Sequence, residues 1–312
     1  MDRKMLGVIL TLIIVFAFFL GLVYVGGNML GVERLQTGER PLLRFAFVGI
    51  GLVAAFLVYA FTKENKAWVV GTREVVYMAI GAALYAVFSY LFNGTVFVVP
   101  SVSQVALRPA ICIPMFFGFA FGPVVGFFTG AVGNMVGDAL TGFGLYPQWS
   151  VGNGLIGLIA GIPMLFADKK KSLDTVLIVG AILAAIGTLF FFLFRTVPNT
   201  LFYDPANNIF GDQPVSLLVG LSIVVGFVLV LIVRFAFGKN IDVAAAVTWG
   251  MLGNLIGLGF AALSDIWING YPLPVAIVGE FLPSAGPNLI FAAILVPILV
   301  IAYKGLQRQT GR

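Results

Sequence analysis

The sequence has few of the side chains on which most enzyme and metal chemistry depends. Its 312 residues include no histidine and one cysteine, Cys112. Without a second cysteine or an imidazole, the chain forms no internal disulfide, holds no zinc or haem through histidine and builds no Cys–His nucleophile pair. A phosphate loop of the GxxxxGKS or GxxxxGKT type does not occur either. We therefore expect no enzyme activity, no cofactor and no metal site, and any ATP-driven step must use another subunit.

Charged residues are also scarce. They make up 10% of the chain, against roughly 25% in soluble domains, while 60% of the residues are hydrophobic. Apolar runs recur near the roughly 20 residues that cross a hydrocarbon layer about 30 Å thick. A β-barrel would show alternating segments of about 10 residues, whereas residues 5–30 are apolar on every face. The sequence predicts an all-α, polytopic bundle of transmembrane helices.

Hydropathy predicts about ten spans, the first of which is retained because it is longer than the apolar core of a signal peptide. The fourth is short for a crossing, so we expect it to be tilted, extended or only partly spanning. The predicted spans are 5–30, 42–61, 74–92, 109–122, 124–142, 150–167, 174–196, 215–237, 243–267 and 288–303.

The distribution of basic residues predicts the orientation of these spans. Positive residues concentrate in cytoplasmic loops. With the N-terminus inside, the outer side holds five of the 18 basic residues and the inner side holds the rest. The outer five are Arg34, Arg40, Arg44, Arg108 and Arg195. We expect a multi-pass protein of the cell membrane with both termini in the cytoplasm, and a net charge of +5 that serves topology and lipid contact and indicates no nucleic-acid partner.

Glycines at four-residue spacing predict close helix packing. They stand at 118, 122, 126 and 130, followed by 133 and 137. Small residues at this spacing let helix backbones approach in lipid, and Gly122-Pro123 predicts a tight turn between two helices. The motif GNMVG at 133–137 returns as GNLIG at 253–257, which is either an internal repeat or a chance match in glycine-rich helices.

The polar residues of the spans gather at the predicted outer side. Because charges near hydrocarbon are costly, this gathering favours a pocket open to the outside. The alternative is an ordinary interfacial aromatic belt with solvated helix ends. Asp138 and Asn153 are the better candidates, since each lies in a glycine-lined helix that must face protein. The full set is Arg108, Asp138, Arg195, Asp265 and Glu280, with Asn134, Asn153, Asn254 and Asn288, and with Tyr146, Trp149, Trp267 and Tyr271. The segment 93–108 is too polar and interrupted to span the membrane, and its alternating pattern predicts a short strand or a lid over a ligand.

Residues 73–166 resemble the S components of energy-coupling-factor (ECF) transporters, the substrate-binding membrane subunits of vitamin importers. The resemblance rests on REVVYMAIGAALYAVFSYL, on LRPAICIPMFFGFAFGPVVGFFTGAVGNMVGDALTG and on WSVGNGLIGLIAGIPML. The first segment carries Ala79-x-x-x-Ala83, with Ala82-x-x-x-Ala86 beside it, and looks like the AxxxA contact of this family with its transmembrane coupling protein.

The resemblance implies a six-helix core, for which our preferred assignment is 74–167 together with 243–303. Residues 1–72 then form an N-terminal transmembrane hairpin with a cytoplasmic linker. Residues 73–312 form the S-component-like domain, which carries an additional hairpin near 174–237.

The resemblance also implies a receptor for a small vitamin-like ligand that works in the lipid bilayer with a coupling protein and ATPase subunits. The ligand would lie near the outer surface under the loop 93–108, where rings stack on a flat heterocycle and amides and carboxylates give directional hydrogen bonds. The residues expected to bind it are Arg108, Asp138, Trp149, Asn153, Asp265, Glu280 and Asn288, and those expected to contact the coupling protein are Ala79 and Ala83.

Two other functions stay open from the sequence. A secondary permease is favoured by about ten spans and the repeat, although it would need a coupling carboxylate near the middle of the bilayer. A structural subunit of a larger membrane complex is the other alternative, with the first two helices as docking elements.

Overall fold

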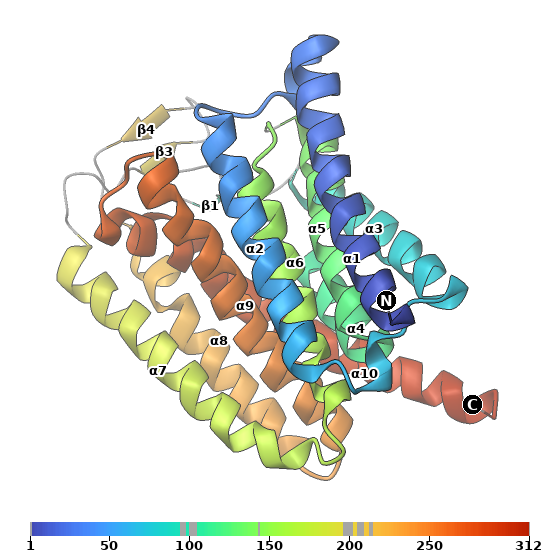
Figure 1. Ribbon diagram of the computed structural model, residues 1–312. Coiled ribbons are helices and arrows are strands. Elements are labelled where there is room, and N and C mark those ends of the chain that lie inside the picture. The colour runs from blue at the N-terminus through green and yellow to red at the C-terminus, as the bar shows by residue number, and fades with distance from the viewer. Residues whose placement is uncertain are drawn as a thin grey trace.

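The structure is a computed structural model that describes residues 2–93, 98–99, 105–142, 144–195, 202–204, 209–211 and 215–311. These ranges contain ten α-helices and four short strands, which confirms the predicted helical bundle (Figure 1). The helices are α1 Arg3–Leu20, α2 Pro41–Thr62, α3 Thr72–Asn93, α4 Cys112–Phe121, α5 Pro123–Thr141, α6 Pro147–Gly161, α7 Lys170–Phe194, α8 Leu217–Ala236, α9 Ile241–Ile268 and α10 Leu282–Gln309. A π-helix, Gly21–Met29, extends α1, and another, Val275–Phe281, leads into α10.

Two antiparallel strand pairs occur in the connections. Strands β1 (Val98–Val99) and β2 (Val105–Ala106) pair between α3 and α4, with Val98 opposite Ala106. Strands β3 (Phe202–Asp204) and β4 (Ile209–Gly211) pair between α7 and α8. The short strand predicted within 93–108 is thus present, whereas 94–97 and 100–104, where a lid was expected, lie outside the described residues.

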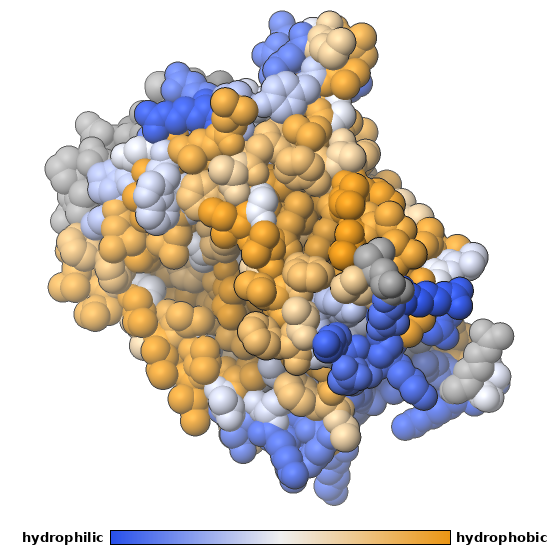
Figure 2. All heavy atoms as spheres, in the orientation of Figure 1, coloured by the Kyte–Doolittle hydropathy of each residue, from blue (hydrophilic) through white to orange (hydrophobic). Residues whose placement is uncertain are grey.

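Within the described part of the chain, seven helical segments are long and apolar enough to cross a membrane. They are Arg3–Met29, Pro41–Thr62, Thr72–Phe92, Pro123–Thr141, Lys170–Phe194, Ile241–Ile268 and Val275–Gln309. The apolar segments Pro109–Phe121 and Gly220–Ala236 are shorter, in line with the short fourth span that hydropathy predicts. A broad hydrophobic band covers the visible flank of the molecule, with hydrophilic areas above and below it (Figure 2).

The last helix begins earlier than predicted. Hydropathy placed the span at 288–303, but helical structure starts at Val275 and continues to Gln309. The additional residues include Glu280, Pro283 and Gly286, which lower the hydropathy of this stretch although all three are buried. Protein contacts therefore hold the helix where its own composition does not predict a span.

Helices α5, α6 and α9 form the centre of the bundle. Helix α5 packs against α3 and α6, and α6 packs against α5 and α9. Around this centre, α1 lies against α5, α2 against α6, α7 against α9, and α8 against α10. Figure 1 shows α7 and α8 side by side at the lower left of the bundle and α1 at its upper right.

Glycines allow the central helices to touch through their backbones, as the sequence predicts. A Cβ atom on Gly126 would lie 2.3 Å from the carbonyl oxygen of Gly157, and one on Gly157 would lie 2.0 Å from the carbonyl oxygen of Gly126. On the other side of α6, a Cβ on Gly257 would lie 2.4 Å from the carbonyl oxygen of Gly152. The predicted turn is also present, since α4 ends at Phe121 and α5 begins at Pro123.

Loops far apart in sequence meet at each end of the bundle. At one end, here called the terminal end, Lys4 Nζ donates to the carbonyl of Lys63, and Asp242 pairs with Lys304 over 3.0 Å. At the opposite end, here called the hairpin end, Arg40 donates to the carbonyl of Trp267 over 3.0 Å. Both termini lie toward the terminal end, away from β3 and β4 (Figure 1).

Candidate functional site

A buried hydrogen-bonded group, here called the Arg108 cluster, lies toward the hairpin end of α5 and α6. It consists of Arg108, Asn134, Asp138 and Ser150, together with Tyr85 and Asn153. Arg108 precedes α4, and its guanidinium donates to the Asn134 side-chain oxygen and, over 3.2 Å, to Asp138 Oδ1. Asn134 Nδ2 lies 2.7 Å from Asp138 Oδ2 and 3.0 Å from Ser150 Oγ. These contacts join α5 and α6 to the segment that follows β2.

Tyr85 extends the Arg108 cluster to α3. Its hydroxyl is fully buried and donates to Asn153 Oδ1 over 2.7 Å. Asn153 Nδ2 in turn donates to the carbonyl of Trp149, one turn earlier in α6. A phenol within an apolar span needs such a partner when it is buried. The Arg108 cluster therefore uses side chains from α3, α5 and α6.

A second buried group, here called the Asp265 cluster, joins α6 to α9 and to the π-helix before α10. Its members are Gln148, Trp149, Asp265 and Glu280. Trp149 Nε1 donates to Asp265 Oδ2 over 2.8 Å, and Gln148 Nε2 donates to Asp265 Oδ1 over 3.2 Å. Asp265 also shares a hydrogen bond with Glu280, and both carboxyl groups belong to residues that are 1% exposed. A hydrogen bond between two carboxyl groups requires a proton on one of them.

Arg44 of α2 lies beside the Asp265 cluster. It is buried, its Nε donates to the carbonyl of Glu39 over 2.9 Å, and its Nη2 donates to Asn269 Oδ1 over 3.1 Å. The guanidinium also lies over the Tyr146 ring, 5.2 Å from its centre. Helix α2 thus places a cation near the carboxyl groups of the Asp265 cluster.

The two clusters are close enough to act on the same tyrosine. Burial raises the pKa of Tyr146, the charge of Arg44 lowers it, and the carboxyl groups of Asp138, Asp265 and Glu280 raise it further. Asp138 belongs to the first cluster and the other two carboxyl groups belong to the second. Tyr146 precedes α6, whose first two turns supply residues to both groups. The two clusters therefore form one polar region around the start of α6.

Burial and charge also act on two further groups outside the spans. Burial lowers the pKa of Arg108, but the opposite effect of Asp138 and the hydroxyl of Tyr85 leaves that pKa raised. Burial together with Glu280 and Asp265 raises the pKa of Tyr271 to about 12. Arg108 is therefore a cation held by its partners, and the phenol of Tyr271 is neutral at physiological pH.

Most of the predicted ligand-binding residues meet in this polar region. Arg108, Asp138 and Asn153 belong to the first cluster, and Trp149, Asp265 and Glu280 belong to the second. Asn288 is also buried, two turns beyond Glu280 on α10, but within the described residues it is not joined to either cluster by a hydrogen bond. Arg195, noted among the outer charges, instead donates to the carbonyl of Val215 at the α7–α8 connection.

Four members of the polar region were not among the candidates from sequence. They are Tyr85, Gln148, Ser150 and Arg44. Gln148 and Ser150 flank Trp149, so the polar start of α6 is a signal that the sequence does carry. Tyr85 and Arg44 sit in spans that are otherwise apolar, where a buried polar group indicates a polar partner on another helix.

Helix α3 has two faces, which separate its two alanine pairs. Ala82 and Ala86 are buried, and Gly133 of α5 approaches the carbonyl of Ala82. Ala79 and Ala83, the pair expected to contact a coupling protein, are exposed. The structure therefore leaves the Ala79–Ala83 face of α3 accessible from the membrane.

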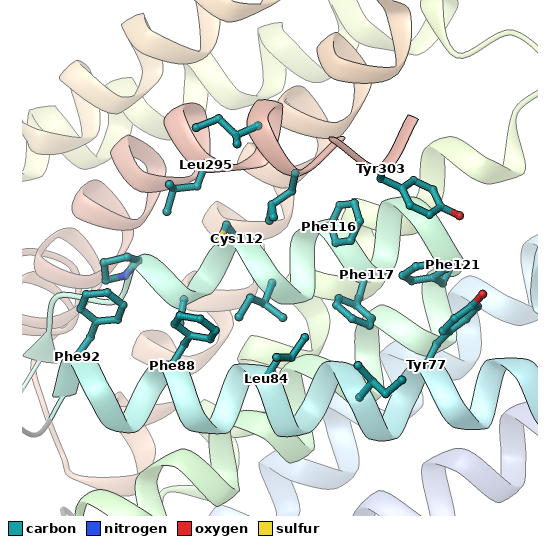
Figure 3. Close-up of a pocket in the computed structure, with 16 residues that line it drawn as sticks. Tyr77, Leu84, Phe88, Phe92, Cys112, Phe116, Phe117, Phe121, Leu295 and Tyr303 are labelled. Carbon is teal, nitrogen blue, oxygen red and sulfur yellow. The ribbon is translucent and has the colours of Figure 1, made fainter. Parts of the chain in front are cut away.

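An apolar groove of about 570 Å³ runs beside this face, between α3, α4 and α10 (Figure 3). Leu84 and Phe88 extend from α3 toward α4, and Leu295 lies across from them on α10. At one end, the rings of Tyr77 and Phe121 stack with centres 4.0 Å apart, and Tyr303 lies 5.4 Å from Phe121. The groove is lined by apolar and aromatic side chains, so it suits a hydrophobic surface and not a polar ligand.

Comparison with known proteins gives a family match and several relatives. The family described as ECF-type riboflavin transporter, S component, matches residues 69–233. A UPF0397 protein of Vibrio atlanticus (strain LGP32) is 35% identical over 100 residues, which are 32% of this chain and 53% of that protein. A UPF0397 protein of Aliivibrio fischeri (strain MJ11) is 30% identical over 145 residues, 44% of this chain and 76% of the relative.

The matched regions differ in extent. The chain spans about half the length of the Vibrio atlanticus relative and three quarters of the Aliivibrio fischeri one. The family match begins just before α3 and ends within α8, so it includes the α7–α8 hairpin and stops before α9. No solved structure matches the chain.

Proposed function

Because the chain belongs to the family of S components of ECF-type riboflavin transporters, we propose that it is the membrane subunit that captures the transported small molecule at its hairpin end. The polar region around the start of α6 is the observation that carries this proposal. Ionisable side chains within a membrane bundle are costly, so their concentration at one end favours a binding function over packing alone. The ligand contacts Arg108, Asp138 and Asn153 on one side and Trp149, Asp265 and Glu280 on the other.

The hairpin end faces the outside of the cell and both termini face the cytoplasm. This orientation is supported by the basic residues of the terminal end, which include Lys4, Lys63, Lys169 and Lys304. Positive residues are retained on the cytoplasmic side during insertion. A ligand is then captured from outside at the hairpin end.

The S-component core of the proposal consists of α3 to α6 with α9 and α10. These helices supply all members of the Arg108 and Asp265 clusters, together with the segments before α4 and before α10. Residues 1–72 add the α1–α2 hairpin to one side of this core, and α7 and α8 add a second hairpin within residues 73–312. The binding region thus has a common scaffold and two peripheral additions.

A transmembrane coupling protein binds the Ala79–Ala83 face of α3, and separate ATPase subunits supply the energy. Small residues favour this role because they allow a partner helix to approach the backbone closely. The apolar groove beside them enlarges the hydrophobic area available to the partner. The chain itself then needs no nucleotide site.

Riboflavin is the first ligand to test, since the family description names it. The purified full chain in detergent should quench the fluorescence of riboflavin on titration, because a flavin ring that stacks on Trp149 loses emission by contact. Asp138→Asn and Asn153→Ala should weaken binding at least 10-fold by removing hydrogen-bonding groups from a buried site. Asp174→Asn, at the terminal end with an 83% exposed side chain, is the matched control.

Two results would contradict the proposal. One is unchanged riboflavin affinity in both site variants, with Asp174→Asn also unchanged. The other is uptake of the ligand into liposomes by the isolated chain without ATP, which would identify a permease that works alone.

A further inference from the structure

Two buried side chains, Gln148 of the Asp265 cluster and Arg44 beside it, each keep one polar atom without a hydrogen-bond partner among the described residues. Arg44 is 2% exposed, and its Nε and Nη2 have acceptors but its Nη1 has none. Gln148 is 0% exposed, and its Nε2 donates to Asp265 but its Oε1 accepts from no group. Buried polar atoms are nearly always paired, so an unpaired donor and an unpaired acceptor in one region indicate a missing partner.

The two side chains that carry these atoms both interact with Asp265. The amide of Gln148 is fixed by its bond to Asp265 Oδ1. The charge of Arg44 acts on Asp265 and Glu280 and on the phenols of Tyr146 and Tyr271. The guanidinium is held from α2 and the amide from α6. The two side chains therefore reach the neighbourhood of one carboxyl group from two different helices.

The charges of this region are balanced before any ligand binds. Asp265 and Glu280 share one hydrogen bond and hence one proton, so together they carry a single negative charge. Arg44 supplies one positive charge. A ligand with a net charge would upset this balance within a buried site, where charge is costly. The region therefore suits a neutral group that offers both an acceptor and a donor.

We propose that Arg44 Nη1 and Gln148 Oε1 recognise the edge of a cyclic amide or imide, with the guanidinium donating to its carbonyl and the glutamine oxygen accepting from its N–H. The inference rests on the proposed function, because this edge belongs to the captured ligand. It assigns α2 a direct part in ligand specificity. Helix α2 lies outside the residues 69–233 that match the family, so the N-terminal hairpin adds a contact to the core.

The competing explanation is a buried water that bridges the two atoms. A water can accept from Arg44 and donate to Gln148, and it would do so whether or not a ligand is present. Loss of that water would change the stability of the protein but not its choice between ligands. The decisive measurement is therefore ligand discrimination.

The experiment compares riboflavin with 3-methylriboflavin, which keeps both carbonyls of the imide edge but has a methyl group in place of its N–H. Fluorescence titration of the purified full chain should show at least 10-fold tighter binding of riboflavin. Gln148→Leu removes the acceptor and should reduce this preference to less than threefold. Arg44→Met removes the carbonyl donor and should weaken both ligands at least 10-fold.

A nearby arginine provides the matched control. Arg40 is exposed, and its Nη1 donates to the carbonyl of Trp267 over 3.0 Å. Arg40→Met should leave both affinities unchanged. Should Arg44→Met fail to give a monodisperse protein, Arg44→Lys keeps the charge but lacks the second guanidinium nitrogen, and it should also weaken both ligands.

The outcomes separate this inference from the proposed function. If the wild type binds both flavins and the Arg44 and Gln148 variants bind them equally well, the inference is overturned while the proposed function stands. A lower melting temperature with unchanged discrimination identifies the bridging water and also overturns the inference.

If the wild type binds neither flavin, native mass spectrometry of the protein purified from cells decides whether the inference stands. Loss of a retained small molecule in Arg44→Met supports the inference, its retention overturns it, and no retained molecule in the wild type overturns both.

Discussion

Trp149 Nε1 donates a hydrogen bond to Asp265 Oδ2 over 2.8 Å and so ties the first turn of α6 to the last turns of α9. Trp149→Phe keeps an aromatic ring but removes the indole N–H, so the buried carboxyl group of Asp265 has one donor fewer. We expect this change to lower the free energy of unfolding by about 1–3 kcal/mol. Denaturant titration in detergent measures it. Trp267 is 57% exposed. Trp267→Phe should therefore change the free energy of unfolding by no more than about 0.5 kcal/mol.

The ion pair of Arg108 and Asp138 predicts a non-additive mutant cycle. Arg108→Gln leaves Asp138 as an uncompensated charge in the bundle, and we expect a loss of about 3–5 kcal/mol in unfolding free energy. The double variant with Asp138→Asn should recover more than half of that loss, because no buried charge is left. Equal stability of the single and double variants would contradict a role for charge.

An ion pair with one exposed partner serves as the reference for that cycle. Arg73 pairs with Glu74 over 2.8 Å, and the Arg73 side chain is 76% exposed, whereas that of Glu74 is 13% exposed. Because such a pair is screened by solvent, Arg73→Gln should cost less than about 1 kcal/mol. A loss as large as that of Arg108→Gln would show that burial does not govern the difference.

The backbone contact between α5 and α6 predicts a large effect of one methyl group. Gly157→Ala places a Cβ 2.0 Å from the carbonyl oxygen of Gly126, and backbone cannot move aside as a flexible side chain can. We expect a drop of more than about 3 kcal/mol in unfolding free energy or loss of the folded protein, by the overpacking of a close-packed interior. A stability equal to that of the wild type would exclude this contact.

Gly49 on α2 gives the matched control for that substitution. A Cβ atom there would meet no other atom within 4 Å. Gly49→Ala should leave the protein as stable as the wild type or slightly more stable, because alanine favours the helix by about 1 kcal/mol relative to glycine. The same thermal-melting or denaturant assay compares the two variants.

The exposed alanines of α3 predict where a coupling protein binds. Ala79→Trp with Ala83→Trp fills the space that a partner helix would use, and should abolish copurification of the coupling protein and ATPases without changing riboflavin affinity. Ala185→Trp is the control, since Ala185 is exposed on α7, on another side of the bundle. Loss of the complex in the Ala185 variant as well would show that this assay reports general disruption.

Hydropathy predicts the helices because most of them face lipid and must be apolar in their own right. The end of α3 or the start of α7 can be placed within a few residues on that basis alone. The start of α10 cannot, because Glu280 and Pro283 are compatible with a helix only when neighbouring helices bury them. The same reason applies to the start of α6, which lies at Pro147, three residues before the predicted span 150–167, because Gln148 lies in a helix there only when neighbouring helices bury it.

The candidate site is predictable only in part for a related reason. Membrane topology brings Asp138, Asn153 and Asp265 to one end of the bundle, and this much follows from the order of the spans. Which residues touch depends on the rotation of each helix about its axis. The bond from Tyr85 to Asn153 and the approach of Arg44 to Asp265 require the α3–α5–α6 and α2–α6–α9 packing, which spacing along the chain does not encode.

Helix α6 has a consequence for how the protein is made. It has 15 residues, and all of them except Trp149 are buried against other helices. Such a segment gains little by entering lipid alone, and one of its two glycine-lined sides is covered only when α9 arrives, some 80 residues later in the chain. During synthesis, α6 must therefore wait beside α5 at the insertion machinery, and the ribosome completes α7 and α8 before the polar region can close.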